Sequence, residues 1–393
     1  MGETWDVAIA GGGVMGSSIA YALASDPGFD GRVLVIERDP SYGACATTRS
    51  WGGVRQQFSN KENILMGLYG VDFVRRAHEI LAVDGEDPPD LGFKENGYLF
   101  LASERGRSVL EANQRLQAEL GAHTVLLEPA QMEARFSWLN TEGLALGCYG
   151  ESGEGWIDPS ALLHAFRRKA LSLGVTYLTD EVVALERDGG RIVGLETKAN
   201  GRFACGQLVK AAGPWSGYLA ALAGLELPVR PRKRMSYVYD CRTEIPKMPL
   251  TIDTNGVVAR PEGGQYISIV SPDPESDPDS HDLDEDYTIF EEIIWPSIAH
   301  RIPAFEAIKL TGAWAGHYDY NTLDQNAILG PHPEVANFLA CTGFSGHGLQ
   351  QSPAAGRALA ELILHGEYRS LDLSVFNYAR IVEGRPIYEQ NVV

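Results

Sequence analysis

This chain opens on Asp6-Val-Ala-Ile-Ala-Gly-Gly-Gly-Val-Met-Gly16, the stretch that decides its fold. The apolar run carries no charge after Asp6 and so predicts a buried parallel strand. Gly11, Gly13 and Gly16 then follow the G-x-G-x-x-G spacing. Such glycines allow a tight turn, the close approach of backbone N–H groups to a pyrophosphate, and close contact between a helix and a strand. We expect that helix over the small residues that follow, with its partly positive N-terminus facing the phosphates.

A second strand and its terminal glutamate complete this unit. Val33-Leu-Val-Ile36 predicts the strand. Glu37 ends it, about twenty residues after the last glycine, where it can accept hydrogen bonds from ribose hydroxyls. The glycine spacing alone is a weak signal, because a glycine-rich turn can lack a ligand. Strand, glycines, helix, strand and glutamate in this order predict a dinucleotide-binding site.

Composition limits the class of protein. A chain of 393 residues with 44% hydrophobic residues predicts two domains or one elaborated domain. A net charge of −19 argues against nucleic acid or an anionic membrane as a partner. The first strand begins by Asp6, which leaves no room for a signal peptide, and no apolar run approaches the length of a membrane span. We therefore expect a cytoplasmic location.

The cysteines point the same way. They are odd in number, scattered, and without a C-x-x-C pair. This pattern favours free thiols in a reducing compartment over a disulfide scaffold or a zinc site, so no metal is expected. The cysteines are Cys45, Cys148, Cys205, Cys241 and Cys341.

The segment 45–58 is rich in hydroxyls, glycine and arginine and predicts a functional loop. Residues 47–50 (Thr-Thr-Arg-Ser) could donate hydrogen bonds to phosphates, and Gly52 and Gly53 would let a flat group come close. Arg55 is the candidate for holding an anion, although a surface arginine is about as compatible with this stretch alone.

Apolar periodicity and end signals predict the remaining helices. Asp158 is a good N-cap, Pro159 suits the first helical position, and Gly366 is a C-terminal stop. The expected helices cover residues 63–83, 106–120, 128 onward, 160–173, 289–300 and 348–365.

Two kinds of strand pattern follow. Residues 97–102 and 175–178 predict strands, and residues 181–208 a β-meander that leads to the Gly-Pro turn at Gly213, a second place where backbone can approach a ligand. From Pro228 polar and apolar residues alternate, which predicts an antiparallel sheet with one covered and one available face. Its expected strands are 235–239, 256–260, 265–270 and 309–316.

Two further segments are distinctive. Residues 273–286 are strongly acidic but lack the glycine and regular ligand spacing of a calcium loop, so we expect a solvated, mobile loop. Phe338-Leu-Ala-Cys-Thr-Gly-Phe-Ser-Gly-His-Gly348 predicts a strand that ends in a glycine loop. The N-terminus of the following helix would thus also face a site.

The cofactor elements fall in separated pieces, so the domains are expected to interleave. The predicted fold is α/β (α+β): a Rossmann-like dinucleotide-binding domain interleaved with an antiparallel-sheet substrate domain. The first would comprise residues 1–90, 150–227 and 312–393. The second, a cap, would comprise residues 91–149 and 228–311.

Four stretches together resemble the D-amino-acid oxidase / sarcosine oxidase superfamily of FAD proteins. They are Gly11–Gly16 with Glu37, Ser50-Trp-Gly-Gly-Val-Arg-Gln-Gln-Phe-Ser59, Ala211-Ala-Gly-Pro-Trp215 and Gly343-Phe-Ser-Gly-His-Gly-Leu-Gln-Gln351. The resemblance spans nearly the whole chain and looks strongest to the sarcosine oxidase β-subunit-like and mitochondrial FAD-dependent oxidoreductase members. It implies FAD, an amine or amino-acid substrate, and a substrate sheet that roofs the flavin.

The resemblance also implies roles for single residues. Arg55 matches the arginine that binds the substrate carboxylate, and Val183 would meet the adenine through its backbone. Candidates to act at the reaction centre are Arg55, His317, Tyr318, His347 and Gln350. The residues implied to bind the cofactor are Gly11, Gly13, Val14, Met15, Gly16, Glu37, Arg38, Thr48, Arg49, Ser50, Val183, Ala212, Gly213, Trp215, Gly346, His347, Gly348, Leu349 and Gln350.

Three positions depart from the family pattern. Gln350 stands where monomeric sarcosine oxidase has a second carboxylate-binding lysine, so the anion clamp is weaker or the substrate differs. His317 replaces the flavin-linking cysteine of that enzyme, and Ser50 the linking histidine of sarcosine dehydrogenase. The FAD is therefore expected to be non-covalent.

The leading hypothesis is an FAD-dependent oxidoreductase that oxidises the C–N bond of a carboxylated amine or amino acid, similar to sarcosine, proline or a glycine derivative. Hydride would pass to flavin N5 and leave an imine that water hydrolyses, which depends more on placing the C–H bond than on a strong base. The walls of the substrate site could include Tyr237, Tyr239, Tyr318 and Tyr320. Each of these tyrosines could equally be a strand residue packed in the core. O₂ or another redox partner would take the electrons.

Two alternatives are weighed against this hypothesis. The chain could be a flavoprotein subunit or assembly factor of a larger complex, with weak or no turnover of its own, in a possible hetero-oligomer. A nicotinamide dehydrogenase rests on the first glycine motif alone. The Gly343–Gly348 loop, which is expected for FAD, counts against it.

Overall fold

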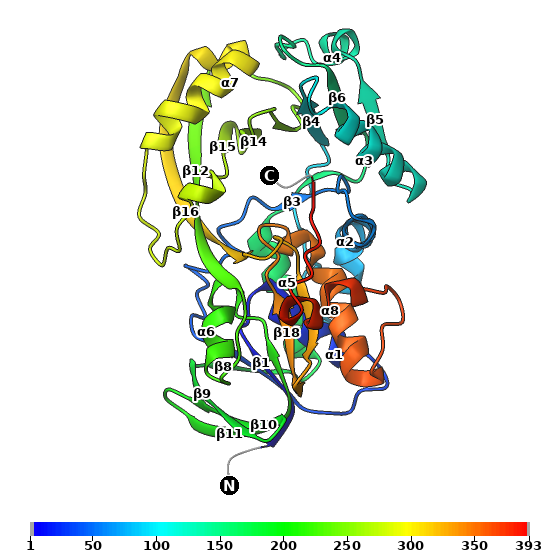
Figure 1. Ribbon diagram of the computed structural model, residues 1–393, viewed down its shortest axis with the longest axis vertical. Helices are drawn as coiled ribbons and strands as arrows, with labels where there is room; N and C mark the ends of the chain where they lie inside the picture. Colours follow the sequence, from blue (N-terminus) through cyan, green and yellow to red (C-terminus); the bar gives the residue numbers. More distant parts are fainter. Residues whose placement is uncertain (1–3, 391–393) are drawn as a thin grey trace.

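The computed structural model describes residues 4–390 and is built on two large sheets, one below the other in Figure 1. The lower, eight-stranded sheet has the order β17-β18-β11-β1-β2-β8, and β10 and β9 extend it from β11. The pairs β1–β2, β1–β11, β2–β8 and β11–β18 are parallel. Its strands are β1 (Thr4–Ala10), β2 (Val33–Glu37), β8 (Thr176–Thr179), β9 (Val182–Asp188), β10 (Arg191–Thr197), β11 (Gly201–Lys210), β17 (Ile328–His332) and β18 (Val335–Thr342).

Long helices cover one face of this sheet (Figure 1). They are α1 (Val14–Ser25), α2 (Lys61–Ile80), α5 (Pro159–Ser172) and α8 (Gly348–His365). A Cβ on Gly356 of α8 would lie 2.1 Å from Ser18 Oγ of α1, and Ser18 Oγ donates to Ser352 O at 2.7 Å. Small residues thus let α1 and α8 pack closely, side by side over the first strand unit.

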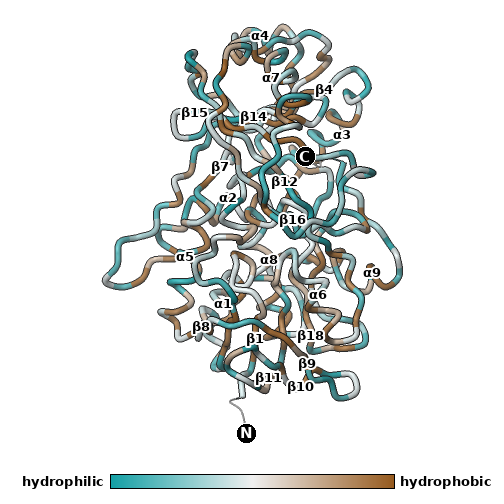
Figure 2. The backbone as a smooth tube through the Cα atoms, turned by 90° about the vertical axis from the view of Figure 1, so that its left-hand side faces the viewer, coloured by the Kyte–Doolittle hydropathy of each residue, from teal (hydrophilic) through white to brown (hydrophobic). Residues whose placement is uncertain are grey.

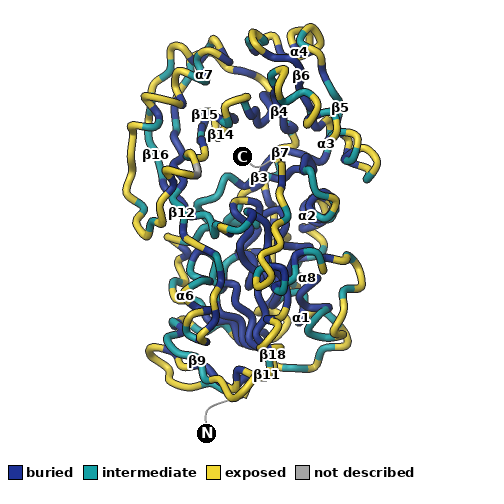
Figure 3. The backbone as a smooth tube through the Cα atoms, in the orientation of Figure 1, coloured by how far each residue is buried: buried dark blue, intermediate teal, exposed yellow. Residues whose placement is uncertain are grey.

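The central strands of this sheet are buried on both faces, as apolar parallel strands require. Ile9 and Val209 contribute to the core beneath the helices, and Ala8 and Leu208 to a second core on the opposite face. Figure 2 shows largely hydrophobic chain around β1 and β18, and Figure 3 shows the same region as buried. The first strand unit is therefore formed as its sequence predicts.

The upper, eight-stranded sheet has the order β16-β12-β15-β14-β13-β4-β6-β5 (Figure 1). All its pairs are antiparallel except β13–β4. Its strands are β4 (Tyr98–Ala102), β5 (Thr124–Leu127), β6 (Leu146–Gly150), β12 (Val229–Cys241), β13 (Leu250–Ile252), β14 (Val258–Glu262), β15 (Gln265–Ile269) and β16 (Ile308–Asn321).

Smaller elements complete the chain. A two-stranded sheet joins β3 (Gly53–Val54) to β7 (Gly155–Trp156). The helices α3 (Arg107–Glu119), α4 (Pro129–Arg135) and α7 (Trp295–Arg301) accompany the upper sheet, and a π-helical turn (Phe290–Ile294) precedes α7. The short helix α6 (Ser216–Ala221) follows β11. The short helix α9 (Ala379–Val382) precedes the C-terminal segment. No helix within residues 4–390 is long and apolar enough to cross a membrane.

The structure corrects one sequence-based boundary. β16 pairs with β12 from Ile308 to Asn321 without leaving the upper sheet. The expected domain boundary at residue 312 therefore falls inside a strand, and the upper sheet includes residues 312–321.

Residues 273–286, which the sequence predicts to be a solvated, mobile loop, are mostly exposed, and they are also anchored to β12 at several points. Residues 277–286, which we call the acidic strap, lie along β12. Asp277 accepts from both terminal nitrogens of Arg234, at 2.9 and 2.8 Å, and Lys233 Nζ lies 2.7 Å from Asp282 Oδ1. Tyr237 Oη donates to Asp286 O at 2.5 Å. Consecutive basic residues on β12 thus bind the acids of the strap.

Candidate functional site

A cavity of about 460 Å³ is lined by residues of both large sheets. Its floor comes from the turn after β1, the loop 44–55, the turn after β11 and the start of α8. Its roof comes from β4, β12, β13, β14 and β15. A concave site of this size between two layers suits a bound small molecule.

The turn between β1 and α1 is shaped for close backbone approach. Gly11 has φ +104°, and a Cβ there would lie 2.4 Å from Ala211 O, so only glycine fits. Gly13 is the N-cap of α1 without any side-chain capping bond, and the first turn of the helix carries no acidic residue. The N-terminus of α1 therefore presents backbone N–H groups and positive potential to the cavity.

Glu37 lies at the end of β2, as its position in the sequence predicts. Its Oε2 accepts from Gly12 N at 2.8 Å and its Oε1 from Asp39 N at 2.9 Å. These bonds fix the glutamate beside the glycine turn. Each carboxylate oxygen has two lone pairs, so a ribose hydroxyl can still donate to it.

Gly16 has a structural role. A Cβ at this position would lie 1.9 Å from Gly11 O, and Gly16 is absent from the cavity lining. The third glycine therefore serves the contact between helix and strand and does not touch the cavity.

The loop after β2 brings Thr47, Arg49, Ser50 and Arg55 to the cavity. Thr47 Oγ1 accepts from Val14 N at 3.3 Å, whereas Thr48 Oγ1 donates to Tyr42 O at 2.6 Å and is turned into its own loop. The sequence implied Thr48, but Thr47 is the threonine in the cavity wall.

The turn after β11 is open toward the cavity. Gly213 has φ +53°, lines the cavity, and would place a Cβ with no atom within 4 Å. Trp215 lies beside it, with Arg38 Cζ 4.5 Å from its ring centroid and His281 of the acidic strap stacked at 5.0 Å. The strap thus reaches the rim of the cavity.

A glycine loop between β18 and α8 forms another part of the floor. A Cβ on Gly346 would lie 2.5 Å from the Tyr318 ring, so the loop passes close under that tyrosine. Asp319 Oδ2 accepts from Gly343 N at 2.7 Å and from Phe344 N at 3.2 Å. Burial raises the pKa of Asp319 to about 6, which these backbone bonds oppose. Asp319 therefore holds the loop in place.

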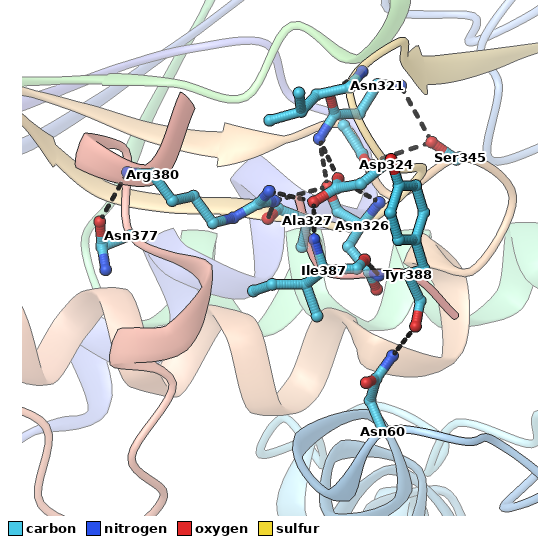
Figure 4. Close-up of polar contacts among 12 residues, drawn as sticks. Asn60, Asn321, Asp324, Asn326, Ala327, Ser345, Asn377, Arg380, Ile387 and Tyr388 are labelled. Atoms are coloured by element: carbon cyan, nitrogen blue, oxygen red, sulfur yellow. Dashed lines mark hydrogen bonds and ion pairs between the residues drawn. The ribbon is translucent and has the colours of Figure 1, made fainter. Parts of the chain in front are cut away.

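A buried polar network supports the same loop from below (Figure 4). Asp324 and Arg380 form an ion pair with both side chains fully buried, and Asp324 Oδ2 also accepts from Ile387 N at 2.8 Å. Asn321 Nδ2 donates to Asp324 Oδ1 at 2.9 Å, and Asn321 N to Ser345 Oγ at 2.9 Å. The C-terminal segment is thereby tied to the glycine loop.

Arg55 lies deep in the cavity wall with 3% of its surface exposed. Its Cζ is 4.1 Å from the Phe58 ring centroid, and its Nη1 donates to Gln57 O. Its Nη2 lies 3.1 Å from His347 Nε2. Burial and the nearby Arg55 charge lower the pKa of His347 to about 3, so the imidazole is neutral and accepts this bond.

Gln350 has a different partner from the one expected. Its Oε1 accepts from Arg55 N at 2.6 Å, so the side chain fixes the backbone of the arginine loop. Gln350 lines the cavity, but this oxygen is used within the protein.

Glu154 is a functional residue that sequence reasoning missed. It is fully buried, and its Oε1 accepts from Gln56 N at 2.6 Å and from Gln57 N at 3.0 Å. Burial raises the pKa of Glu154 to about 7, against these hydrogen bonds and the charge of Arg55. The glutamate therefore anchors the segment that carries Arg55.

The tyrosines proposed as walls are divided between the faces of the upper sheet. Tyr318 lines the cavity. Tyr237 and Tyr239 point to the other face and pack with Phe290 and Phe305, while their neighbour Ser236 faces the cavity. Tyr320 is also outside the cavity lining. Alternation along β12 explains why Ser236 and its tyrosine neighbours face opposite ways. Tyr320 follows Tyr318 by two residues on β16, so it shares the face of Tyr318 and lies further along the strand.

Most of the residues named from the sequence do meet in this cavity. The structure places Val182, one residue earlier than Val183, in its wall. His317 lines the cavity with 9% of its surface exposed, and its Nε2 is buried without a hydrogen-bond partner. The lining includes Gly11, Gly13, Val14, Met15, Glu37, Arg38, Arg49, Ser50, Arg55, Ala212, Gly213, Trp215, His317, Tyr318, Gly346, His347, Gly348, Leu349 and Gln350.

Other lining residues carried no sequence signal. Alternating patterns predicted the roof strands but not which side chains face inward. The missed roof residues are Tyr98, Arg234, Ser236, Leu250, Ile252, Val258, Ile269 and Ser271.

The cavity fits the expected FAD. Two helix N-termini, those of α1 and α8, meet it, and neither N-cap residue makes a side-chain capping bond. Gly213 leaves open space where a Cβ would project, and His317, which lines the cavity, has its Nε2 buried without a partner within the protein. Across residues 4–390 no group of acidic, histidine and cysteine side chains could hold a metal ion.

Comparisons with known proteins give the same family. The profile described as FAD dependent oxidoreductase matches residues 6–362. FAD-dependent oxidoreductase domain-containing protein 1 of Xenopus laevis is 45% identical over 426 residues, covering 100% of this chain and 85% of the relative. Glycine oxidase of Geobacillus kaustophilus (strain HTA426) is 27% identical, covering 97% and 98%. The structure of L-proline dehydrogenase from P. horikoshii superimposes with a TM-score of 0.86 at 25% identity, covering 98% of this chain and 100% of that one.

Proposed function

Because the chain belongs to the family of FAD-dependent oxidoreductases, we propose that it oxidises the C–N bond of a carboxylated amine or amino acid. FAD is its cofactor. When bound, FAD supplies the acceptor for the hydride that leaves the carbon beside the nitrogen. The chain itself must bind the substrate, orient that carbon and keep water away. The electron acceptor, O₂ or a redox partner, belongs to the same proposal.

The observation that carries this proposal is the position of Arg55. Its guanidinium is buried in the wall of the same cavity that receives the glycine turn, the α8 N-terminus and Tyr318. Phe58, His347 and the Gln57 carbonyl hold it in one orientation. A fixed, buried guanidinium suits a bidentate carboxylate.

The neighbouring groups favour positioning over acid–base chemistry. His347 is neutral and accepts a hydrogen bond from Arg55, so it is a positioning residue. Burial raises the pKa of Tyr318, which keeps the phenol protonated and able to donate to the substrate. The amine would lose a hydride from carbon and a proton from nitrogen. The resulting imine would take up water to give a carbonyl compound and a free amine.

The names of relatives support this substrate class. One relative is a glycine oxidase and one structural neighbour an L-proline dehydrogenase, both of which act on carboxylated amines. The substrate of the present chain is part of the proposal.

The direct test is anaerobic mixing of the FAD-loaded protein with N-methyl, cyclic and D-amino acids while the flavin spectrum is recorded. We expect at least one compound to bleach the flavin. If none does, and the protein co-purifies with a partner, the alternative role as a subunit or assembly factor replaces this one.

A variant of Arg55 tests the assigned role. Arg55→Ala should weaken the binding of carboxylates by about 2–4 kcal/mol, because it removes a charge-assisted contact, while FAD stays bound. The exposed Arg105→Ala is the matched control and should bind carboxylates as the wild type does. Equal carboxylate affinity of Arg55→Ala and the wild type would refute the role.

A further inference from the structure

The roof of the cavity carries a continuous apolar surface on three neighbouring strands. Ile252 of β13 pairs with Val258 of β14, and Val258 pairs with Ile269 of β15. All three line the cavity, and we call them the roof ladder. Leu250 of β13 extends it to Tyr98 of β4, its register partner. The roof ladder thus places branched aliphatic side chains opposite the cavity floor.

Two polar side chains beside the roof ladder, Ser236 and Arg234, make hydrogen bonds within the protein, although Arg234 Nε has no partner. Ser236 Oγ accepts from Trp51 Nε1 at 2.8 Å. Arg234 is held by both carboxylate oxygens of Asp277, in a pair with side-chain exposures of 4% and 6%. These bonds leave an apolar wall as the surface that β13, β14 and β15 offer to a ligand.

The acidic side chains that line the cavity do not lie on the roof strands. Among the described residues, the acidic side chains in the lining are Glu37, Asp39, Asp180, Glu181 and Asp319, and none comes from the roof strands. Arg55, which we assign to the substrate carboxylate, comes from the loop after β2. The substrate end of the cavity therefore combines Arg55, the roof arginine Arg234 that is already paired with Asp277, and an apolar wall.

We propose that the substrate is an amine with a single carboxylate and an apolar substituent, with the carboxylate on Arg55 and the substituent against the roof ladder. This inference rests on the proposed function and names the substrate class within it. A substituent as small as that of glycine or sarcosine would leave the roof ladder in contact with water. A second carboxylate would lose its hydration against branched aliphatic side chains.

The test uses simple carboxylates that cannot be oxidised at a C–N bond. Acetate, propionate, butyrate, 3-methylbutanoate and 4-methylpentanoate are titrated into the FAD-loaded protein, with the dicarboxylate succinate for comparison. The perturbed flavin absorption gives each Kd. We expect the Kd to fall about fourfold for each added methylene until the wall is covered. Succinate should bind more weakly than butyrate, which has the same number of carbons.

Two variants locate the effect. Val258→Thr keeps the shape of the side chain but adds a hydroxyl to the roof ladder, and Ile252→Ala removes part of the wall. In each variant the Kd for 4-methylpentanoate should rise at least fivefold, and the Kd for acetate should stay within twofold of the wild-type value. Ile293→Ala, at an exposed isoleucine on the outer side, is the control and should change neither. The flavin spectrum of each variant without ligand verifies the fold.

The outcomes separate this inference from the proposed function. A Kd that does not fall with chain length, or tighter binding of succinate than of butyrate, overturns the apolar site even where an amine bleaches the flavin. A chain-length gain that the roof variants abolish supports the apolar site even if no amine bleaches the flavin, in which case the proposed function fails alone. Absence of any carboxylate binding overturns both.

Discussion

Among single residues, Glu154 shows how a buried acid can prepare a site without touching it. Its carboxylate receives two backbone N–H groups from the segment that carries Arg55, and Gln57 Nε2 donates to it at 2.7 Å. Burial raises its pKa to about 7. The folded protein therefore binds a proton there at a pH at which the unfolded chain has already released it.

This difference predicts a pH dependence of stability. Between pH 4.5 and about 7 the folded state holds more protons at Glu154 than the unfolded state, so the free energy of unfolding falls as pH rises through that window. The slope from one such group is about 1.4 kcal/mol per pH unit. Urea unfolding of the wild type and Glu154→Gln from pH 4.5 to 8 measures it.

We expect the stability of the wild type relative to Glu154→Gln to decrease over this range and to level off above pH 7. Glu104→Gln, at a side chain that is 84% exposed, should follow the wild type. Parallel curves for the wild type and Glu154→Gln would mean that Glu154 is not protonated in the folded state.

The contrast between Arg55 and Glu154 shows what single residues reveal in a sequence. Arg55 stands in a distinctive loop next to a glycine pair, so its type and setting predict an anion-binding role. Glu154 stands between two glycines and contacts Gln57, which lies 97 residues earlier. Nothing local marks that contact. Tyr237 and Ser236 pose the same problem, because both faces of β12 are covered and alternation cannot say which face holds the site.

At the scale of elements, the loop between β18 and α8 depends on Asp319 of the neighbouring β16. Asp319→Ala would leave the Gly343 and Phe344 N–H groups buried without an acceptor, at about 1–3 kcal/mol each. Because this loop forms part of the FAD cavity, the Kd for FAD should rise at least about tenfold. Fluorescence titration of the apoprotein with FAD measures this Kd.

Asp319→Asn keeps one acceptor and should have a smaller effect than Asp319→Ala. The exposed Asp188→Ala is the control and should bind FAD as the wild type does. A folded Asp319→Ala protein with unchanged affinity for FAD would show that the loop holds its shape without the aspartate.

The acidic strap allows a paired prediction. The Arg234–Asp277 pair is buried, with 4% and 6% of the side chains exposed, whereas Lys233 and Asp282 are 26% and 50% exposed. Asp277→Ala leaves a buried, unpaired guanidinium and should cost about 3–5 kcal/mol of stability. Asp282→Ala should cost less than about 1 kcal/mol. Chemical denaturation of both variants provides the comparison.

Similar losses of stability in the two variants would contradict this prediction, because they would mean that burial does not distinguish the pairs. The sequence predicted a mobile loop here from its acidic composition and its prolines. It did not reveal the contact with Arg234, which lies 43 residues before Asp277. Acidic composition indicates a solvated segment unless a basic partner is known. That partner is a row of basic residues, 232–234, which lies on β12 just before the strand expected at 235–239.

For the whole molecule, the lower sheet was the more predictable part. Its β1–α1–β2 unit is contiguous, and each of its signals agrees with the next: buried strand, glycine turn, small-residue helix and terminal acid. The upper sheet is assembled from distant pieces, since β13 pairs with β4 and Leu250 lies beside Tyr98. Such pairings are set by packing over long sequence separations, so the sequence predicted the strands but not their order or the residues of the roof.

The cavity that both sheets line leads to the last prediction, that FAD is held without a covalent bond. Its motives come from the family resemblance, which aligns His317 with the linking cysteine and Ser50 with the linking histidine of relatives. Retention then depends on the glycine turns and on the N-termini of α1 and α8. Acid precipitation should release the flavin into the supernatant, and the intact mass should equal that of the polypeptide. Added FAD should raise the melting temperature, with about 2.7 kcal/mol of stabilisation at a hundredfold excess over the Kd.

His317 is the residue that could make this prediction wrong. Its Nε2 is buried without a hydrogen-bond partner, and burial lowers the pKa of His317, so the ring is a neutral nucleophile in the cavity wall. Colour that stays with the acid pellet, together with an intact mass increased by one FAD, would establish a covalent bond. His317→Ala then decides its origin: loss of the bond in this variant would assign the link to His317, and its persistence would assign it to another residue of the lining.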